Sequence, residues 1–277
     1  MKKFPFLHII LFALTLMSTL TVGAMQSGVD LLKEPGKIYK GLPFALTLMT
    51  ILLSHELSHY FASKKHGVKA TLPYFIPAPT IIGTFGAFIK MKSPLISRKS
   101  LIDIGASGPI AGFIVSVAAT VVGLQMSEVV SVRNMAGSLN LGDSILFSFL
   151  AHIILGATPA EADILLNPVA FAGWIGLFVT SMNLIPVGQL DGGHIAYALM
   201  GEKHAKLSLL LVIIMTVLGL LFWEGWFIWA ALLLVLGLRH PPVLYWEVPL
   251  DSGRRFIGWL SLVILILTFI PVPFKIL

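Results

Sequence analysis

The sequence predicts an all-α polytopic membrane protein with six to seven transmembrane helices and one membrane-embedded β-hairpin. Of the 277 residues, 57% are hydrophobic and only 12% are charged, against roughly 25% charged residues in a soluble domain. The segments 4–25 and 207–223 contain no Asp, Glu, Lys or Arg and approach the ~20 residues that span a bilayer. Between apolar blocks, the Pro- and Gly-rich segment 68–93 alternates apolar and β-branched residues, which indicates short strands.

The same composition excludes several classes of protein. The 19 Lys and Arg and 13 Asp and Glu residues are too few for the surface of a soluble enzyme, for a disordered chain or for a nucleic-acid-binding protein. We therefore interpret the net charge of +6 as a signal of membrane topology, with no nucleic acid among the partners. Because the chain has no cysteine, any metal ion must be bound by His, Asp or Glu.

Seven apolar segments are candidate spans, and we expect each to be helical. They cover residues 4–24, 43–64, 102–124, 168–187, 207–223, 226–238 and 256–274. Only Glu224 and Gly225 separate the fifth from the sixth, so these two segments form either one bent helix or a tight helical hairpin. The apolar segment 142–156 is too short to span and predicts an interfacial or re-entrant helix.

The N-terminal segment has a second interpretation. Two lysines precede it, and residues 22–24 (VGA) resemble the small-residue cleavage site of a signal peptide. Whether this segment is retained as a helix or cleaved as a signal peptide, the topology of the later segments is the same. We expect one integral membrane domain over 1–277, with a core at about 43–200, an N-terminal part over 1–42 and C-terminal spans over 201–277.

The distribution of basic residues predicts the orientation, because cytoplasmic loops are enriched in Lys and Arg. With a cytoplasmic N-terminus and seven spans, 14 basic residues lie inside and five outside. If the fifth and sixth segments form one span, the counts become 12 and seven. Both counts place the loops 64–100 and 188–206 in the cytoplasm.

The segment 55–59 (HELSH) is an H-E-x-x-H motif near the cytoplasmic end of the second span. Residues i and i+4 of a helix are about 40° apart, so His55 and His59 lie on one face and can bind one Zn²⁺. Glu56 lies about 100° away, which suits a general base acting on water that the metal activates. Alternatively, the motif is only a polar helix end in water, but ionisable residues within a span favour a function.

A catalytic zinc site usually has three protein ligands. The fourth span ends with 183–194 (NLIPVGQLDGGH), whose proline and glycines predict broken backbone of the kind that lines a polar cavity. This segment brings Asp191 to the same side of the membrane as His59, so Asp191 is the predicted third ligand. Alternatively, Asp191 only caps a helix end. His194 is an alternative ligand, although a place beside the ligands or on the surface suits it better. Two further candidates lie on the opposite side by the charge count: His152 and Glu161.

The motifs, in this order and in membrane spans, resemble the site-2 protease family of intramembrane zinc metalloproteases. Besides 55–59, the matching residues are 183–192, which read N-x-x-P-x-x-x-L-D-G, and the small-residue stretch 107–112 (SGPIAG). The resemblance covers about 43–200. The segment 71–92 is similar to the Pro-rich hairpin of archaeal, cyanobacterial and plant plastid members. The PDZ domain of several bacterial members is not recognised, so regulation by such a domain is not expected.

The resemblance implies a role for each site residue. His55, His59 and Asp191 are the implied ligands of one Zn²⁺ per chain, and Glu56 is the implied catalytic base. Asn183 is implied to stabilise the oxyanion, which suits a side-chain amide because it can donate to the developing tetrahedral oxygen. From spacing alone, Asn183 is only a buried polar residue with a partner.

The implied activity is hydrolysis of peptide bonds within or near transmembrane segments of other proteins, known as regulated intramembrane proteolysis. The expected partners are a transmembrane-helix substrate and the lipid bilayer, in the cell membrane with the active site toward the cytoplasm. A substrate helix must unwind to expose its peptide bonds. The strands of 71–92 either present an edge to the unwound segment or only plug the catalytic cavity.

Three other functions compete with this interpretation. A prenyl-protein protease usually takes a third ligand Glu from a downstream helix, whereas the candidate here is Asp191 in broken backbone. A zinc transporter or a catalytically inactive scaffold needs no general base. The intact Glu56 beside two histidines therefore favours hydrolysis.

Overall fold

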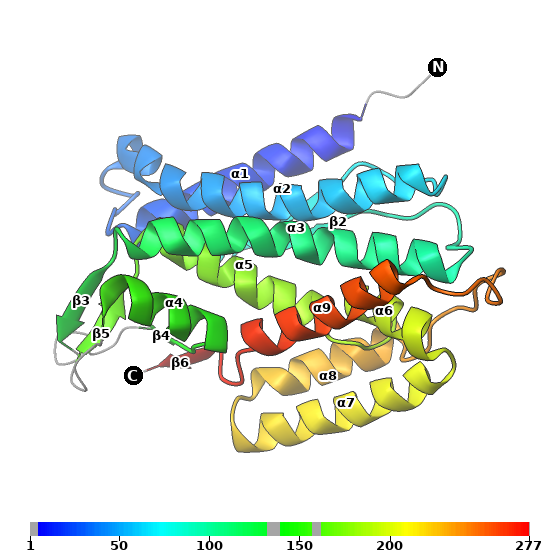
Figure 1. Ribbon diagram of the computed structural model, residues 1–277. Coiled ribbons are helices and arrows are strands. Elements are labelled where there is room, and N and C mark those ends of the chain that lie inside the picture. The colour runs from blue at the N-terminus through cyan, green and yellow to red at the C-terminus, as the bar shows by residue number, and fades with distance from the viewer. Residues whose placement is uncertain (1–4, 132–138, 157–161, 277) are drawn as a thin grey trace. The chain divides into compact units, whose positions relative to one another are not determined.

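The computed structural model describes residues 5–131, 139–156 and 162–276, which are mainly helical with short strand pairs (Figure 1). Arg133 and Glu161, which the charge count placed on the outer side, lie outside the described residues. The chain divides into two compact units. Unit 1 comprises Met1–Ser93, Ala111–Val130 and Leu150–Leu177, and unit 2 comprises Pro94–Ile110, Ser131–Phe149 and Phe178–Leu277.

Each predicted span coincides with a helix. These helices are α1 (Phe6–Gln26), α2 (Leu42–Lys65), α3 (Arg98–Leu124), α5 (Pro168–Leu184), α7 (Lys203–Leu221), α8 (Gly225–Leu236) and α9 (Ser252–Thr268). Among the described residues, four helical segments are long and apolar enough to cross a membrane: Phe6–Gln26, Pro35–Lys65, Arg98–Leu124 and Lys203–Leu221. Helices α5 and α8 are apolar but shorter.

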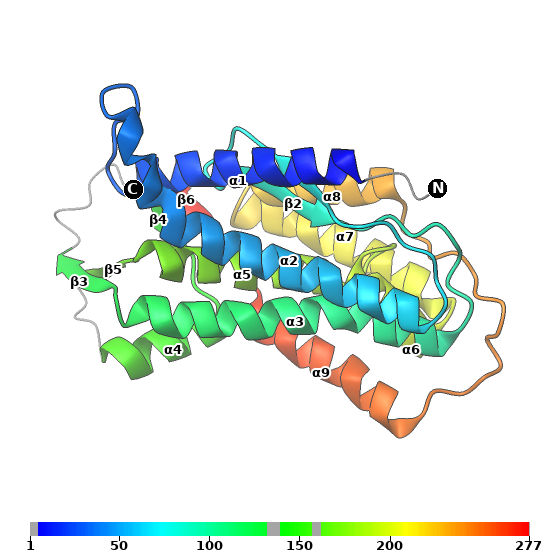
Figure 2. The ribbon, with the colours of Figure 1, turned by 90° about the horizontal axis from the view of Figure 1, so that it is seen from above.

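In unit 1, α1 packs along α2 and against the 3₁₀-helix η1 (Pro35–Gly41) (Figure 2). The contact is made at the backbone. A Cβ atom on Gly41 would lie 2.0 Å from the carbonyl oxygen of Leu20, so only glycine allows this approach. The approach fixes the position of α1 beside the start of α2.

The predicted hairpin is present in unit 1 as β1 (Tyr74–Pro77) and β2 (Thr84–Phe88), which pair antiparallel. It lies against α1. The Ser18 hydroxyl donates to the Gly83 carbonyl at 2.6 Å, and the Gln26 amide donates to the Ile81 carbonyl at 2.9 Å. The first helix thus anchors the tip of the hairpin.

Two further strand pairs were not predicted. Strand β3 (Glu128–Ser131) pairs with β5 (Ala162–Leu165), and β4 (Leu139–Leu141) pairs antiparallel with β6 (Phe274–Ile276). Strands of three or four residues with distant partners leave no alternating pattern in the sequence. The predicted span 256–274 was too long at its C-terminal end, because α9 ends at Thr268. Helix α4 (Ile145–Leu155) occupies the short apolar segment predicted at 142–156.

In unit 2, α7 and α8 are separate helices that pack together, so the tight hairpin is correct and the single bent helix is wrong. Helix α6 (Asp191–Met200) packs against α7 and α9. Arg254 at the start of α9 forms a bidentate ion pair with Asp103 of α3, with N–O distances of 2.8 and 2.6 Å. Helices α7 and α9 thus support the helix that begins at Asp191.

Candidate metal centre

Helix α2 brings the two predicted histidine ligands together. His55 and His59 are each 6% exposed, and their Nε2 atoms are 3.0 Å apart. The uninterrupted helix explains this, because it places residues four apart on the same face. Two nitrogen ligands at 2.0–2.1 Å from one tetrahedral zinc lie about 3.3 Å apart. The histidine pair is therefore close to the geometry of a shared metal ion.

Glu56 lies beside this pair. Its side chain is buried, and its Oε1 atom is 4.0 Å from Nε2 of His55. That distance is too long for a direct hydrogen bond. The carboxylate therefore lies near the histidine pair.

The small-residue stretch of α3 supports His55 within unit 1. A Cβ atom on Gly112 would lie 3.2 Å from Nδ1 of His55 and 3.5 Å from its Cβ atom. A larger residue would therefore push against the imidazole. The small residue at position 112 thus allows α3 to pack closely against His55.

Asp191 lies where the backbone changes from turn to helix in unit 2. Helix α5 ends at Leu184, residues 185–190 are not helical, and α6 begins at Asp191. The predicted break is therefore present, but Gly192 and Gly193 are wrongly assigned to it, since both belong to the first turn of α6. Their role is close packing: a Cβ atom on Gly192 would lie 2.0 Å from the Leu184 carbonyl oxygen.

His194, the alternative ligand, interacts with His240 of the α8–α9 connection. Nδ1 of His194 lies 2.6 Å from Nε2 of His240, and Nδ1 of His240 lies 2.6 Å from the Pro241 carbonyl. Because a carbonyl only accepts, His240 donates from Nδ1 and accepts at Nε2 from His194. Burial lowers the pKa of His240, which favours this neutral form. Nothing in the sequence indicated this pair, because 46 residues separate its members.

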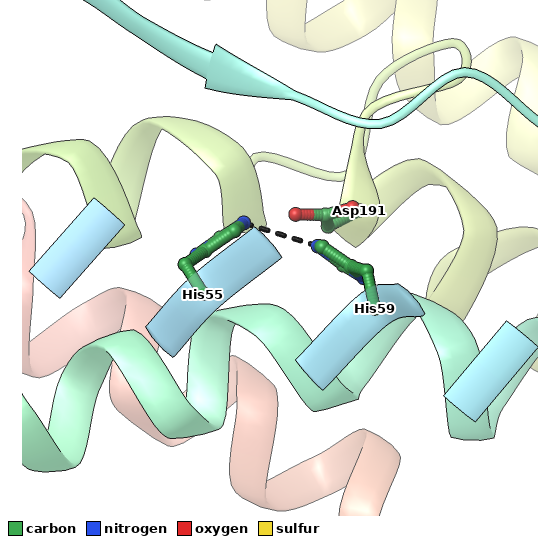
Figure 3. Close-up of side chains that lie close together, drawn as sticks. All are labelled: His55, His59 and Asp191. Atoms are coloured by element: carbon green, nitrogen blue, oxygen red, sulfur yellow. Dashed lines mark hydrogen bonds between the residues drawn. The ribbon is translucent and has the colours of Figure 1, made fainter. Parts of the chain in front are cut away.

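Figure 3 shows His55, His59 and Asp191, a group that could hold a metal ion. Two imidazoles and one carboxylate are a donor set typical of catalytic zinc. The donor chemistry therefore fits the predicted cofactor. Asn183 lies in the last turn of α5 with a half-buried side chain. Its interaction with an oxyanion stays a prediction.

A comparison with models of protein families shows to which family the chain is related. Residues 43–222 match the model of peptidase family M50. This chain belongs to peptidase family M50. The resemblance expected from the motifs is thereby confirmed. The matched range includes all predicted site residues: His55, Glu56, His59, Asn183 and Asp191.

Curated relatives of this M50 chain include plant proteins. It is 31% identical over 248 residues to "Probable zinc metalloprotease EGY2, chloroplastic" of Arabidopsis thaliana, across 89% of the chain. It is 33% identical over 240 residues to "Probable zinc metalloprotease EGY1, chloroplastic" of the same plant, across 83% of the chain. Each alignment covers 43% of the relative. The chain therefore spans less than half the length of these relatives.

Proposed function

We propose that this M50 chain is an intramembrane zinc metalloprotease that hydrolyses peptide bonds within or near transmembrane segments of other proteins. One observation carries the proposal: two imidazoles and a carboxylate are buried on a helix long and apolar enough to cross a membrane. Such groups are costly in a span and are functional by default. Family membership and the relatives' names support the same activity.

His55, His59 and Asp191 are the proposed ligands of one Zn²⁺ per chain. The 3.0 Å separation of the histidine Nε2 atoms and the mixed imidazole–carboxylate donor set support this assignment. When bound, zinc would supply a Lewis acid and lower the pKa of a water molecule.

Glu56 is the proposed general base. Its carboxylate would accept a proton from the attacking water and transfer that proton to the nitrogen of the leaving amine. Its position 4.0 Å from Nε2 of His55 supports a role beside the ligands and not as one of them. Asn183 would donate its side-chain N–H to the carbonyl oxygen that becomes negatively charged.

The substrate class is a transmembrane helix that unwinds locally. The hairpin of β1 and β2, proposed to lie in protein-lined space within the membrane, would present an edge to the unwound segment or plug the cavity. We propose six or seven transmembrane helices, which are the four long helices together with α5, α8 and α9. The whole chain would act as one protease domain with its core at about 43–200.

We place the active site on the cytoplasmic face of the cell membrane, as the distribution of basic residues supports. Because the chain has no cysteine, single cysteines can report the orientation without background labelling. Cysteine variants of the exposed residues Lys33, Lys92 and Lys203 would be treated with a membrane-impermeant maleimide on intact cells. We expect labelling at position 33, and labelling at 92 and 203 only after permeabilisation. The reverse pattern would place the site on the opposite face.

The activity is tested by co-expressing a tagged single-span substrate with the wild type or with Glu56→Gln. Glutamine preserves the shape of Glu56 but cannot act as a base. We expect cleavage only by the wild type, with equal zinc content in both proteins. Equal cleavage by both proteins would overturn the protease proposal. Zinc transport that survives in Glu56→Gln, without cleavage by either protein, would indicate a transporter.

A further inference from the structure

A side chain of α7 holds the turn between α5 and α6 in unit 2. The backbone N–H of Gly188 donates to the hydroxyl oxygen of Ser208 at 3.3 Å. The same oxygen lies 3.2 Å from Nε2 of His204, one helical turn earlier. Ser208 and His204 are both 0% exposed. This buried chain of three groups connects α7 to the segment that leads into Asp191.

The chemistry of the groups fixes the direction of the first hydrogen bond and leaves the Ser208 proton available for the second. An amide N–H only donates, so Ser208 accepts from Gly188 and its own proton is available for Nε2 of His204. Nε2 is then unprotonated, and the proton of the neutral imidazole is on Nδ1. The Pro186 carbonyl also lies beside the imidazole of His204. His204 is therefore linked to the 186–188 turn through Ser208 and lies beside Pro186.

The turn is otherwise held by contacts between backbone atoms. Gly188 has a φ of +55°, and a Cβ atom on it would lie 2.3 Å from the Gly237 carbonyl oxygen. A Cβ atom on Gly193 would lie 2.4 Å from the Gly188 carbonyl oxygen. Glycines provide this close packing but no side chain for an anchor. Ser208 supplies an anchor from α7 and contacts Gly188, which lies three residues before Asp191.

We propose that Ser208 and His204 are positioning residues, which hold the Gly188 amide and thereby fix the direction in which Asp191 is presented. The proposal rests on the proposed function, since Asp191 is the third proposed zinc ligand. Neither residue needs to touch the metal or the substrate. Groups that orient metal ligands typically change metal affinity or activity by roughly 10–100-fold when they are removed.

Ser208→Ala is the first test, and Ser261→Ala is its matched control. Ser261 is also a buried helical serine of unit 2, but its hydroxyl donates to the Ile257 carbonyl of its own helix. We expect Ser208→Ala to weaken zinc affinity about tenfold and to lower kcat with little change in KM. In the metal-free full chain, amides of residues 185–190 should exchange faster than in the wild type. If both variants behave alike in zinc affinity and amide exchange, the proposal is wrong.

Two substitutions of His204 test the direction of the hydrogen bonds. Glutamine can place an acceptor near the position of Nε2, whereas asparagine reaches only the position of Nδ1. We expect His204→Gln to retain most of the zinc affinity and the slow exchange of the turn, and His204→Asn to lose both as Ser208→Ala does. Equal loss in both variants, or better retention by His204→Asn, would contradict a role for His204 through Ser208.

The outcomes separate this inference from the proposed function. Zinc affinity and amide exchange are measured without substrate. If Glu56→Gln cleaves as well as the wild type while Ser208→Ala weakens zinc binding and loosens the turn, positioning stands and the protease proposal fails. If Glu56→Gln is inactive while Ser208→Ala matches Ser261→Ala, the protease proposal stands and positioning fails.

Discussion

The two regions that carry the proposed ligands are built in opposite ways. His55 and His59 lie within a regular helix of 24 residues, where four-residue spacing alone places both imidazoles on one face. Asp191 follows a non-helical turn whose shape depends on backbone contacts that only glycine allows. In α2, metal binding depends on which side chains a regular helix carries. Before Asp191, it depends first on the backbone conformation of the turn.

This difference predicts where each region is sensitive to substitution. In α2, a change at a ligand should remove metal binding and leave the helix folded. In the 185–193 segment, a change at a glycine should disturb the backbone and only thereby affect the metal. The predictions below test this contrast.

Removal of a ligand should have the largest effect. We expect His59→Ala to lower zinc affinity by more than the roughly 10–100-fold typical of residues that support ligands, because it removes one of three proposed donors. Helix content should stay unchanged, since α2 does not depend on the imidazole for its hydrogen bonds. Zinc titration by chelator competition and circular dichroism measure the two quantities. Unchanged zinc affinity would exclude His59 as a ligand.

Gly192→Ala should destabilise the protein more than Gly112→Ala. The new methyl group at 192 would meet the Leu184 carbonyl oxygen at 2.0 Å, whereas the one at 112 would meet the His55 ring at 3.2 Å. Overpacking costs about 1–3 kcal/mol or more, and alanine recovers about 0.5–1 kcal/mol in a helix. We expect a loss of about 3 kcal/mol at 192 and under about 1 kcal/mol at 112, measured by thermal unfolding in detergent. Equal losses would remove the contrast between the two regions.

The same contrast explains what the sequence could predict. Apolar blocks indicated the seven helices that coincide with predicted spans, and the H-E-x-x-H spacing indicated the histidine pair, because both are local patterns. Pro186 and the glycines indicated the break before Asp191. They did not indicate that the break ends at residue 190, because a glycine in a helix cannot be distinguished from a glycine in a turn by sequence alone. Ser208 and His204 gave no signal, since their significance depends on contact with Gly188, 20 residues from Ser208.

The N-terminal ends of α2 and α9 also differ in how much they depend on side-chain contacts. Helix α2 begins with a proline in its first turn and has no side-chain cap, whereas α9 depends on the ion pair of Arg254 with Asp103. The pair is bidentate and partly exposed, with side-chain exposures of 26% and 19%. We expect Arg254→Ala to destabilise the protein by about 1–2 kcal/mol, above the range of fully exposed pairs. A double-mutant cycle with Asp103→Ala measures the coupling, and additive losses would mean that the pair contributes nothing.

Asp251→Asn should have the smallest effect, and one that depends on pH. Asp251 caps α9, and the backbone N–H and guanidinium of Arg254 lower the pKa of its carboxyl below the ordinary value of 3.8. Because the folded state favours the charged carboxylate, its contribution is present above about pH 4 and is lost as the pH falls through the folded pKa. Asparagine also caps helices but does not titrate there. The wild type should therefore unfold at a slightly higher temperature than the variant at pH 7, and this difference should vanish near pH 2. A difference that stays constant over this range would show that the carboxylate charge does not stabilise the start of α9.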